Sequence, residues 1–150
     1  MLKEHAMANE VEILLVEDSL TQALQLKKIL TSLGFIVTHA SDGHQALAAL
    51  RQQRPGLVLS DIVMPEIDGY QLCRQIKEDP EFGDLPIILM TTMTDSHEVV
   101  RALENKADGF ITKPCDPAFL SSRIETALAN RQLRGTSVRR WQETTYRNSD

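Results

Sequence analysis

The feature that most constrains the fold of this chain is a strict alternation between short apolar runs and segments of helical periodicity. Each apolar run is followed by a segment whose apolar residues recur three or four positions apart. The five apolar runs lie at residues 13–16, 35–39, 57–59, 87–90 and 110–112. Five strand–helix units in this order predict an α/β fold, a doubly wound five-stranded parallel sheet with five helices on its two faces.

The apolar runs differ in polarity, and this predicts their places in the sheet. The runs at 57–59 and 87–90 are uninterrupted, which is typical of strands buried on both faces. The run at 35–39 is half polar, so we expect it at an edge of the sheet. The fourth helix is expected to begin near Asp95. It carries an apolar stripe at helical spacing formed by Val99, Leu103 and Ala107.

The composition fits one domain with a substantial core. The chain has 150 residues, of which 42% are hydrophobic and 25% charged. No apolar run reaches membrane-spanning length, and no apolar segment follows the charged N-terminus as in a secretory signal, so we expect a cytoplasmic protein with no membrane partner. Cys73 and Cys115 share no metal-ligand spacing and are expected to be reduced, packed thiols.

Charge is distributed unevenly along the chain. Residues 1–130 carry 11 Lys and Arg against 19 Asp and Glu, whereas residues 131–150 carry five Arg against Glu143 and Asp150. An acidic body repels phosphate backbones, so direct nucleic-acid binding by this part of the protein is not expected. The basic end of the chain, residues 131–150, is interpreted as a tail or linker.

Polar residues follow the predicted strands at the points where they end. In open α/β sheets, ligands bind beyond the carboxyl ends of the strands. Those ends carry Glu17 and Asp18 after the first strand, Asp61 after the third, Thr91 after the fourth and Lys113 after the fifth. We therefore expect three carboxylates, a hydroxyl and an ammonium group at one edge of the sheet.

Such a group of carboxylates requires a cation. Two carboxylates about 4 Å apart repel each other by roughly 4 kcal/mol at an effective dielectric near 20. Mg²⁺ suits the set because it prefers oxygen ligands and leaves room for phosphate oxygens. Asp61 can then attack a phosphoryl group while Lys113 and the Thr91 hydroxyl stabilise its oxygens. The pattern predicts an acyl phosphate on Asp61.

The same residues belong to a longer series of short motifs in a fixed order. The series is Glu17-Asp18, Asp61 with Met64-Pro65 and Asp68-Gly69, then Thr91, Phe110 and Lys113-Pro114. With this series, the chain resembles the receiver domain of two-component response regulators, the CheY-like family. The resemblance covers residues 11–130 and implies the strand order 2-1-3-4-5. It leaves residues 1–10 as an N-terminal extension and residues 131–150 as the tail or linker.

The resemblance implies a role for each site residue. Asp61 would be the phosphorylation site, and Asp18 and Asp61 would bind Mg²⁺ directly together with the Val63 carbonyl. Glu17 would act on the metal through water. A cis peptide bond between Lys113 and the following proline would turn the lysine into the site.

The resemblance further implies a signalling switch. Phosphorylation would draw in Thr91 and let Phe110 rotate, changing the surface formed by the fourth helix, the fifth strand and the last helix. A sensor histidine kinase or phosphotransfer protein would supply the phosphoryl group, and this surface would bind a partner or a second copy of the chain. Such a domain catalyses only its own phosphorylation and slow dephosphorylation.

Slow dephosphorylation is expected from two apolar side chains. In the resembled family, the residues two positions beyond the phosphorylated Asp and two beyond the switch Thr flank the path of the attacking water. Here they are Val63 and Met93, neither of which orients a water by hydrogen bonding. The acyl phosphate on Asp61 is therefore expected to be long-lived.

Other functions on a similar fold require sequence features that this chain lacks. A haloacid-dehalogenase-type, Mg²⁺-dependent phosphohydrolase requires a second Asp two residues after the nucleophile, where this chain has Val63. A flavin or nucleotide binder requires a phosphate-cradling loop after the first strand, where Glu17 and Asp18 repel phosphate. A receiver-shaped interaction module without phosphorylation stays open as an alternative. The sequence does not identify the cognate kinase or the output.

Overall fold

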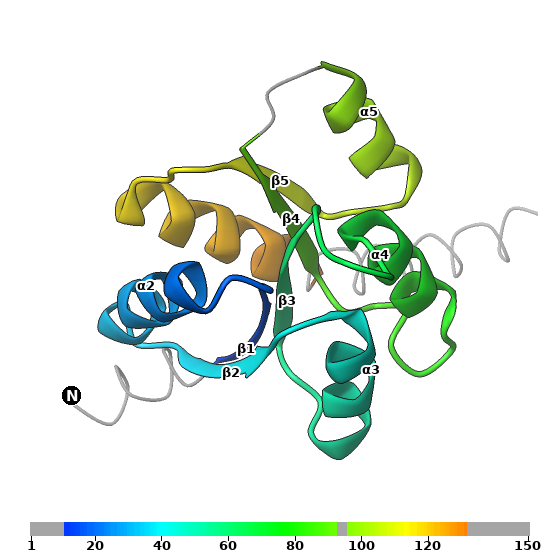
Figure 1. The fold of residues 1–150 in the computed structure, drawn as a ribbon, viewed down its shortest axis with the longest axis horizontal. Helices are drawn as coiled ribbons and strands as arrows, with labels where there is room; N and C mark the ends of the chain where they lie inside the picture. Colours follow the sequence, from blue (N-terminus) through cyan, green and yellow to red (C-terminus); the bar gives the residue numbers. More distant parts are fainter. Residues whose placement is uncertain (1–10, 93–95, 132–150) are drawn as a thin grey trace, which may run out of the picture.

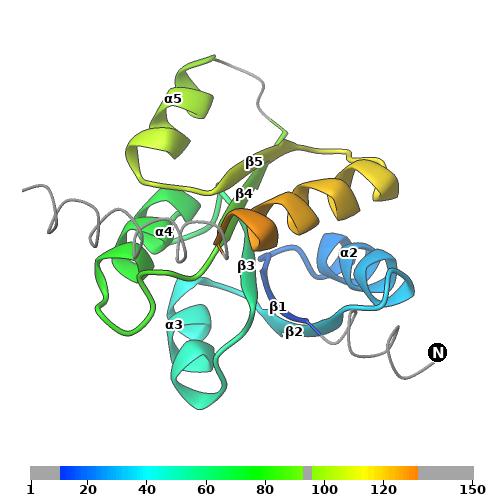
Figure 2. The same cartoon turned by 180° about the vertical axis from the view of Figure 1, so that it is seen from behind.

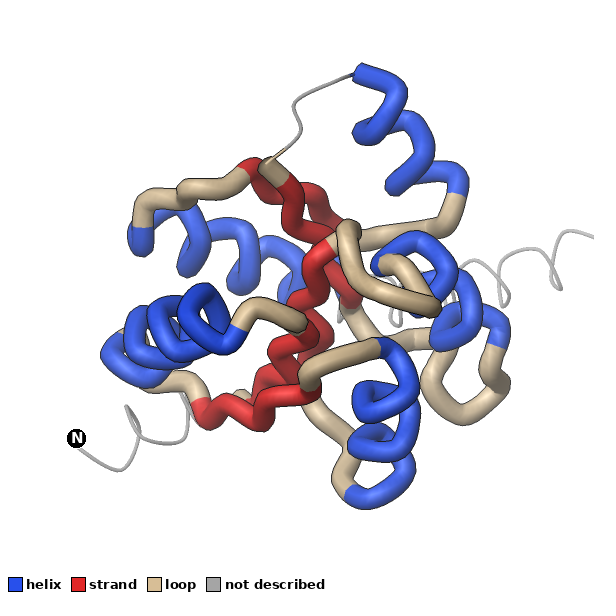
Figure 3. The backbone as a smooth tube through the Cα atoms, in the orientation of Figure 1, coloured by secondary structure: helices blue, strands red, loops and turns tan. Residues whose placement is uncertain are grey.

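A computed structural model describes residues 11–92 and 96–131 of the chain. They form a central parallel sheet flanked by helices (Figures 1 and 3). The strands are β1 (Glu12–Val16), β2 (Ile36–Ala40), β3 (Leu57–Asp61), β4 (Ile87–Thr91) and β5 (Gly109–Thr112). The helices are α2 (Leu20–Ser32), α3 (Gly43–Gln52), α4 (Gly69–Glu78), α5 (Ser96–Glu104) and a C-terminal helix that is described over residues 117–131.

The sheet has the order β2-β1-β3-β4-β5 with every pair parallel, which confirms the predicted topology. All residues of β3 and β4 are buried, as expected for central strands covered on both faces. The half-polar second strand lies at an edge, as predicted. It begins at Ile36, one residue later than the sequence indicated.

Two hydrophobic clusters occupy the two faces of the sheet. The side chains of β1 alternate between them, with Ile13 and Leu15 in one cluster and Leu14 and Val16 in the other. The first cluster packs under α2 and the C-terminal helix, and the second packs under α3, α4 and α5 (Figures 1 and 2). The carboxyl ends of the strands therefore remain open between the two helical layers.

Helix α5 departs from its expected packing. Of the predicted stripe, Leu103 is 66% exposed and Val99 is 38% exposed, while Ala107 is half-buried against the core but lies beyond the end of α5. Within α5, Ala102 is buried against the sheet. The stripe therefore does not form the buried face of α5. The helix lies over the side of the sheet that ends in the edge strand β5, so a small residue makes the inward contact and the larger apolar residues stay uncovered.

A buried ion pair lies at the amino-terminal end of the sheet, beside β4 and β5. Lys77 Nζ of α4 lies 2.6 Å from Asp108 Oδ2, and both side chains are almost fully buried. The same ammonium donates to the Leu85 carbonyl at 2.6 Å, and the same carboxylate accepts from the Ile87 amide at 2.8 Å. This pair fixes the amino-terminal ends of β4 and β5 against α4.

Two further sequence expectations concern cysteines and membranes. Cys73 is buried and Cys115 is half-buried, and both thiols are free. Among the helices that the structure describes, none has the length and apolar character needed to cross a membrane.

Candidate phosphoryl-acceptor site

Three carboxylates meet at the carboxyl edge of the sheet. Glu17 and Asp18 follow β1, and Asp61 is the last residue of β3. One carboxylate oxygen from each lies within 4.8 Å of the others. Glu17 is 1% exposed and Asp61 is 8% exposed, while Asp18 is exposed to solvent. The sequence prediction that these three side chains converge is confirmed.

Backbone hydrogen bonds position the two buried acidic residues. The Glu17 amide donates to the carbonyl of Ala40 at 3.1 Å, extending the β1–β2 pairing beyond Val16. The Ile62 amide donates to Asp61 Oδ1 at 2.9 Å, which orients that carboxylate at the strand end. Each acid is thus positioned by a central strand rather than by a free loop.

Lys113 supplies the positive charge of the site. Its peptide bond to Pro114 is cis, as the family resemblance implied, and its amide donates to the Thr91 carbonyl at 2.8 Å. Its Nζ lies 2.6 Å from Glu17 Oε1 and 3.3 Å from Asp61 Oδ2. One ammonium group therefore contacts both buried carboxylates.

The first turn of α2 contributes contacts that the sequence analysis missed. Gln22 Oε1 accepts from Lys113 Nζ at 2.7 Å, and the Ser19 amide donates to Glu17 Oε2 at 3.2 Å. Ser19 also caps α2 by accepting from the Gln22 amide. The available signal was a helix-capping serine directly after the acidic pair, which places the first turn of α2 beside the site.

The two buried acids have opposite pKa shifts. Burial raises the pKa of Asp61 to about 6, opposed by Lys113 and reinforced by the Glu17 carboxylate. Burial also acts to raise the pKa of Glu17, but hydrogen bonds from Lys113 and the Ser19 amide outweigh it and lower this pKa. Lys113 Nζ also lies closer to Glu17, at 2.6 Å, than to Asp61, at 3.3 Å. Burial therefore disfavours the charged form of Asp61 more than Lys113 favours it.

The chain after Asp61 turns sharply back on itself before α4 begins. Asp68 caps α4 in a capping box with Gln71. The Gly69 amide donates to the Ile62 carbonyl at 2.8 Å. A Cβ at position 69 would lie 2.4 Å from the Asp61 carbonyl oxygen, so only glycine allows this approach.

The remaining predicted site residues lie around this centre. Thr91 is 1% exposed at the end of β4, beside β3 in the sheet. Phe110 on β5 is half-buried against the cluster under α3, α4 and α5. Val63 lies two residues beyond Asp61, with its side chain 59% exposed. Met93 lies outside the described residues.

The arrangement suits a divalent cation with oxygen ligands. Among the described residues, three carboxylates meet beside one ammonium group, so these groups together carry an excess of negative charge. The exposed side of the group is at Asp18, which gives an ion access from solvent. Hard cations such as Mg²⁺ bind such oxygen sets and retain several waters.

Comparison with known proteins identifies the family. The sequence model described as the response regulator receiver domain matches residues 13–125. The chain belongs to this receiver family. It therefore has the architecture of the receiver domains of two-component systems, in agreement with the resemblance seen in the sequence.

Individual relatives agree with this assignment. The chain is 40% identical over 124 residues to the transcriptional regulatory protein CseB of Streptomyces avermitilis, covering 81% of the chain and 51% of CseB. A signal receiver domain of a histidine kinase from Syntrophus aciditrophicus superposes with a TM-score of 0.74 at 47% identity, covering 80% of this chain and 91% of that one. The chain spans about half the length of the curated relatives that it matches.

One similar structure contains a metal. The receiver domain of a sensor histidine kinase from Pseudomonas aeruginosa was solved with a magnesium ion coordinated in its active site cleft. It superposes with a TM-score of 0.74 at 30% identity, covering 80% of this chain and 98% of that domain.

Proposed function

We propose that Asp61 accepts a phosphoryl group from a sensor histidine kinase or a phosphotransfer protein. The observation that carries this proposal is the position of Asp61, at the end of a central strand, with Lys113 Nζ 3.3 Å from its carboxylate and two further acids beside it. Family membership supports the same reaction class. The receiver-shaped module without phosphorylation is less well supported, because this charge arrangement has no evident structural purpose.

In the proposed reaction, an Asp61 carboxylate oxygen forms a bond to phosphorus while the bond from phosphorus to the donor nitrogen breaks. The electron pair of the broken bond stays with the donor histidine, and the phosphoryl group ends as an acyl phosphate. Lys113 neutralises part of the charge on the transferred oxygens, and the Thr91 hydroxyl donates to one of them. The chain catalyses only this step and the slow hydrolysis of the acyl phosphate, in which water takes the phosphoryl group as inorganic phosphate and frees the Asp61 carboxylate.

Mg²⁺ is the proposed cofactor. Asp18 and Asp61 would hold it together with the Val63 carbonyl, and Glu17 would contact it through water. Bound there, the ion supplies charge stabilisation for the phosphoryl oxygens. The proposal is supported by the three carboxylates that meet beside the Lys113 ammonium group in the described part of the chain.

The proposed output is a change in the surface formed by α5, β5 and the C-terminal helix. Thr91 would move toward the phosphoryl group, and Phe110 would follow into the vacated space. This surface already exposes apolar side chains, because Val100, Leu103 and Phe119 are 51%, 66% and 46% exposed. We propose that it binds a partner or a second copy of the chain, with residues 131–150 acting as a basic tail or linker after the domain and residues 1–10 as an extension before it.

The proposed setting is the cytoplasm, where kinases of this class present their phosphohistidine. The acidic balance of residues 1–130 argues against nucleic-acid binding by the domain itself. Any DNA-directed output would then belong to a partner or a further domain.

The test is phosphorylation by a small-molecule donor. The full chain is incubated with acetyl phosphate and Mg²⁺ and its intact mass is measured. We expect one added phosphoryl group, lost with Asp61→Asn or when the Mg²⁺ is chelated. Asp84→Asn, which changes an exposed aspartate on the α4–β4 connection, is the matched control and should label as wild type. Full labelling of Asp61→Asn would overturn the proposal.

A further inference from the structure

Helix α5 is held in place by unusually few apolar contacts. Among its residues with described side chains, Ala102 alone is buried, and Val99, Val100 and Leu103 face solvent. Helix α4 beside it buries five residues. Because apolar burial provides most of the energy that docks a helix, α5 depends more heavily on its remaining contacts.

Those remaining contacts include three pairs of residues that join α4 to α5 or to the residue just after it. The Tyr70 hydroxyl donates to the Glu98 carbonyl at 3.0 Å and contacts the Glu98 carboxylate in the first turn of α5. The Arg101 guanidinium lies 4.5 Å from the centroid of the Tyr70 ring. At the other end, Cys73 Sγ donates to the Asn105 carbonyl at 3.2 Å.

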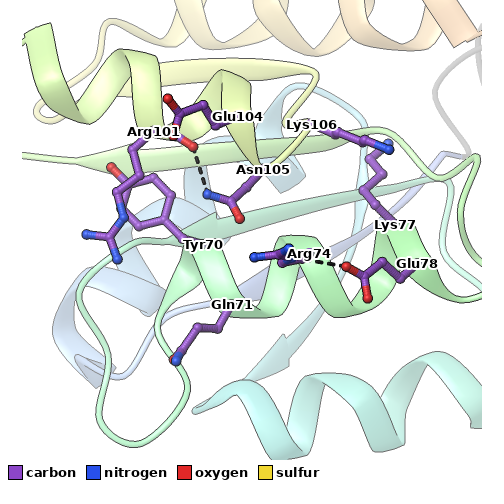
Figure 4. Close-up of a pocket in the computed structure, with 9 residues that line it drawn as sticks. All are labelled: Tyr70, Gln71, Arg74, Lys77, Glu78, Arg101, Glu104, Asn105 and Lys106. Atoms are coloured by element: carbon purple, nitrogen blue, oxygen red, sulfur yellow. Dashed lines mark hydrogen bonds and ion pairs between the residues drawn. The ribbon is translucent and has the colours of Figure 1, made fainter.

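The Tyr70 side chain is buried between α4 and α5. Tyr70 is 2% exposed, and its ring lies at the end of a cavity of about 570 Å³ between α4 and α5 (Figure 4). Figure 4 shows Arg101 of α5 beside the ring, while Arg74 turns along α4 toward Glu78. The contact between the two helices at this end therefore runs through Tyr70.

Tyr70 also follows a residue whose backbone contacts the phosphoryl-acceptor site. Gly69 precedes it, and the Gly69 backbone packs directly against Asp61 and Ile62. Any change of the Asp61 backbone on phosphorylation therefore reaches the start of α4 within one residue of Tyr70. From there the hydroxyl contacts α5, the helix whose apolar side faces solvent.

We propose that Tyr70 is a positioning residue that holds α5 in its resting place through Glu98 and so opposes the movement of α5 when Asp61 is phosphorylated. The inference rests on the proposed phosphoryl-acceptor function. By linkage, a contact that stabilises only the resting state lowers the affinity of the site for a phosphoryl group or its mimic.

The test compares wild type with Tyr70→Phe, which removes the hydroxyl and keeps the ring. Hydrogen exchange of the amides at 96–104 is measured without ligand, and the affinity for beryllofluoride in Mg²⁺ is measured by titration of the full chain. Loss of one hydrogen bond is expected to speed exchange in α5 by about fivefold and to tighten beryllofluoride binding by a similar factor.

Two further variants separate coupling from simple loss of packing. Glu98→Ala removes the carboxylate contact but keeps the carbonyl that accepts from Tyr70, so it should shift both measurements in the same direction by a smaller factor. Arg74→Ala alters the same cavity without touching α5 contacts and should match wild type in both. A Tyr70→Phe protein whose beryllofluoride affinity equals or falls below that of wild type overturns the inference, whatever its exchange rates.

The outcome also distinguishes this inference from the function on which it rests. If wild type binds beryllofluoride and Tyr70→Phe binds it no better, the positioning role of Tyr70 alone is wrong. If wild type neither binds beryllofluoride nor accepts a phosphoryl group from acetyl phosphate, both proposals fail.

Discussion

The two ends of the sheet each bury a lysine among acidic groups, but the two lysines are balanced differently. At the amino-terminal ends of β4 and β5, Lys77 pairs with the carboxylate of Asp108, and each side chain also forms a hydrogen bond with a backbone group. At the carboxyl ends, Lys113 faces the carboxylates of Glu17 and Asp61, with Asp18 beside them. The charges of Lys77 and Asp108 cancel, whereas the described groups at the carboxyl ends include more carboxylates than ammonium groups.

The difference separates a structural ion pair from a site prepared for a ligand. A buried pair that is fully hydrogen-bonded resists the removal of either partner, because the other charge is then stranded. A group with surplus negative charge is instead relieved by a cation or by protonation. Burial is the main cause of the raised pKa of Asp61, and the neighbouring Glu17 carboxylate adds to it.

The largest effect is expected at the balanced pair. Lys77→Met leaves the Asp108 carboxylate buried without its ammonium and should lower the free energy of unfolding by about 3–5 kcal/mol, measured by urea denaturation. Lys77→Met combined with Asp108→Asn removes both charges and retains an acceptor for the Ile87 amide, so it should recover most of the loss. A single Lys77→Met protein within about 1 kcal/mol of wild type would break the comparison.

At the unbalanced site, removing a charge should stabilise the protein. Because the pKa of Asp61 is raised from 3.8 to about 6 in the fold, its contribution to stability is present below pH 4 and is lost as the pH rises through 6. Asp61→Asn avoids that loss. Without Mg²⁺ at pH 7.5, the free energy of unfolding of Asp61→Asn should exceed that of wild type by about 2–3 kcal/mol. The difference should disappear toward pH 4.

Asp84 provides the matched control for this pH effect. Burial alone would raise the pKa of Asp84, but hydrogen bonds from Arg54 and Arg131 lower it. Its contribution therefore has the opposite sign, being present above the ordinary pKa and lost as the pH falls. Asp84→Asn should give a small loss of stability at pH 7.5, as is usual for exposed pairs. A gain for Asp84→Asn equal to that of Asp61→Asn would mean that general charge reduction, not the local imbalance, explains the result.

A smaller effect is expected on the lifetime of the acyl phosphate. Val63, two residues beyond Asp61, is exposed and apolar. Met93, two residues beyond Thr91 in the sequence, is expected on the other side of the path of the attacking water. The double variant Val63→Asn with Met93→Glu adds groups that orient water and should shorten the half-life in Mg²⁺ several-fold. The decay of phosphoprotein after removal of the donor gives the rate. A decay no faster than that of wild type would show that water access does not limit hydrolysis.

Much of the fold and of the site could be predicted because both depend on where strands end. The apolar runs fix β1, β3 and β4, and their carboxyl ends carry Glu17, Asp61 and Thr91, so convergence follows from a parallel sheet. Helix starts were also predictable where a capping residue marks them, as Asp68 does for α4.

The parts that could not be predicted depend on pairing between distant segments. Lys77 and Asp108 are 31 residues apart, and neither carries a local signal for burial. In α5, helical spacing identified an apolar stripe, but the face that packs is set by the neighbouring strand and by Tyr70 of α4, and it is the face of Ala102. Gln22 and Lys113 are 91 residues apart and come together only in the folded chain.

The central claim is that the surplus charge at the carboxyl edge serves phosphorylation of Asp61. The most direct measurement is to phosphorylate the chain with acetyl phosphate and Mg²⁺, reduce the product with borohydride, and map the modified residue by peptide mass spectrometry. Borohydride converts an aspartyl phosphate to homoserine. We predict homoserine at position 61 alone, and none when Mg²⁺ is chelated. Homoserine at Asp18 or at another aspartate, with Asp61 unmodified, would contradict the account.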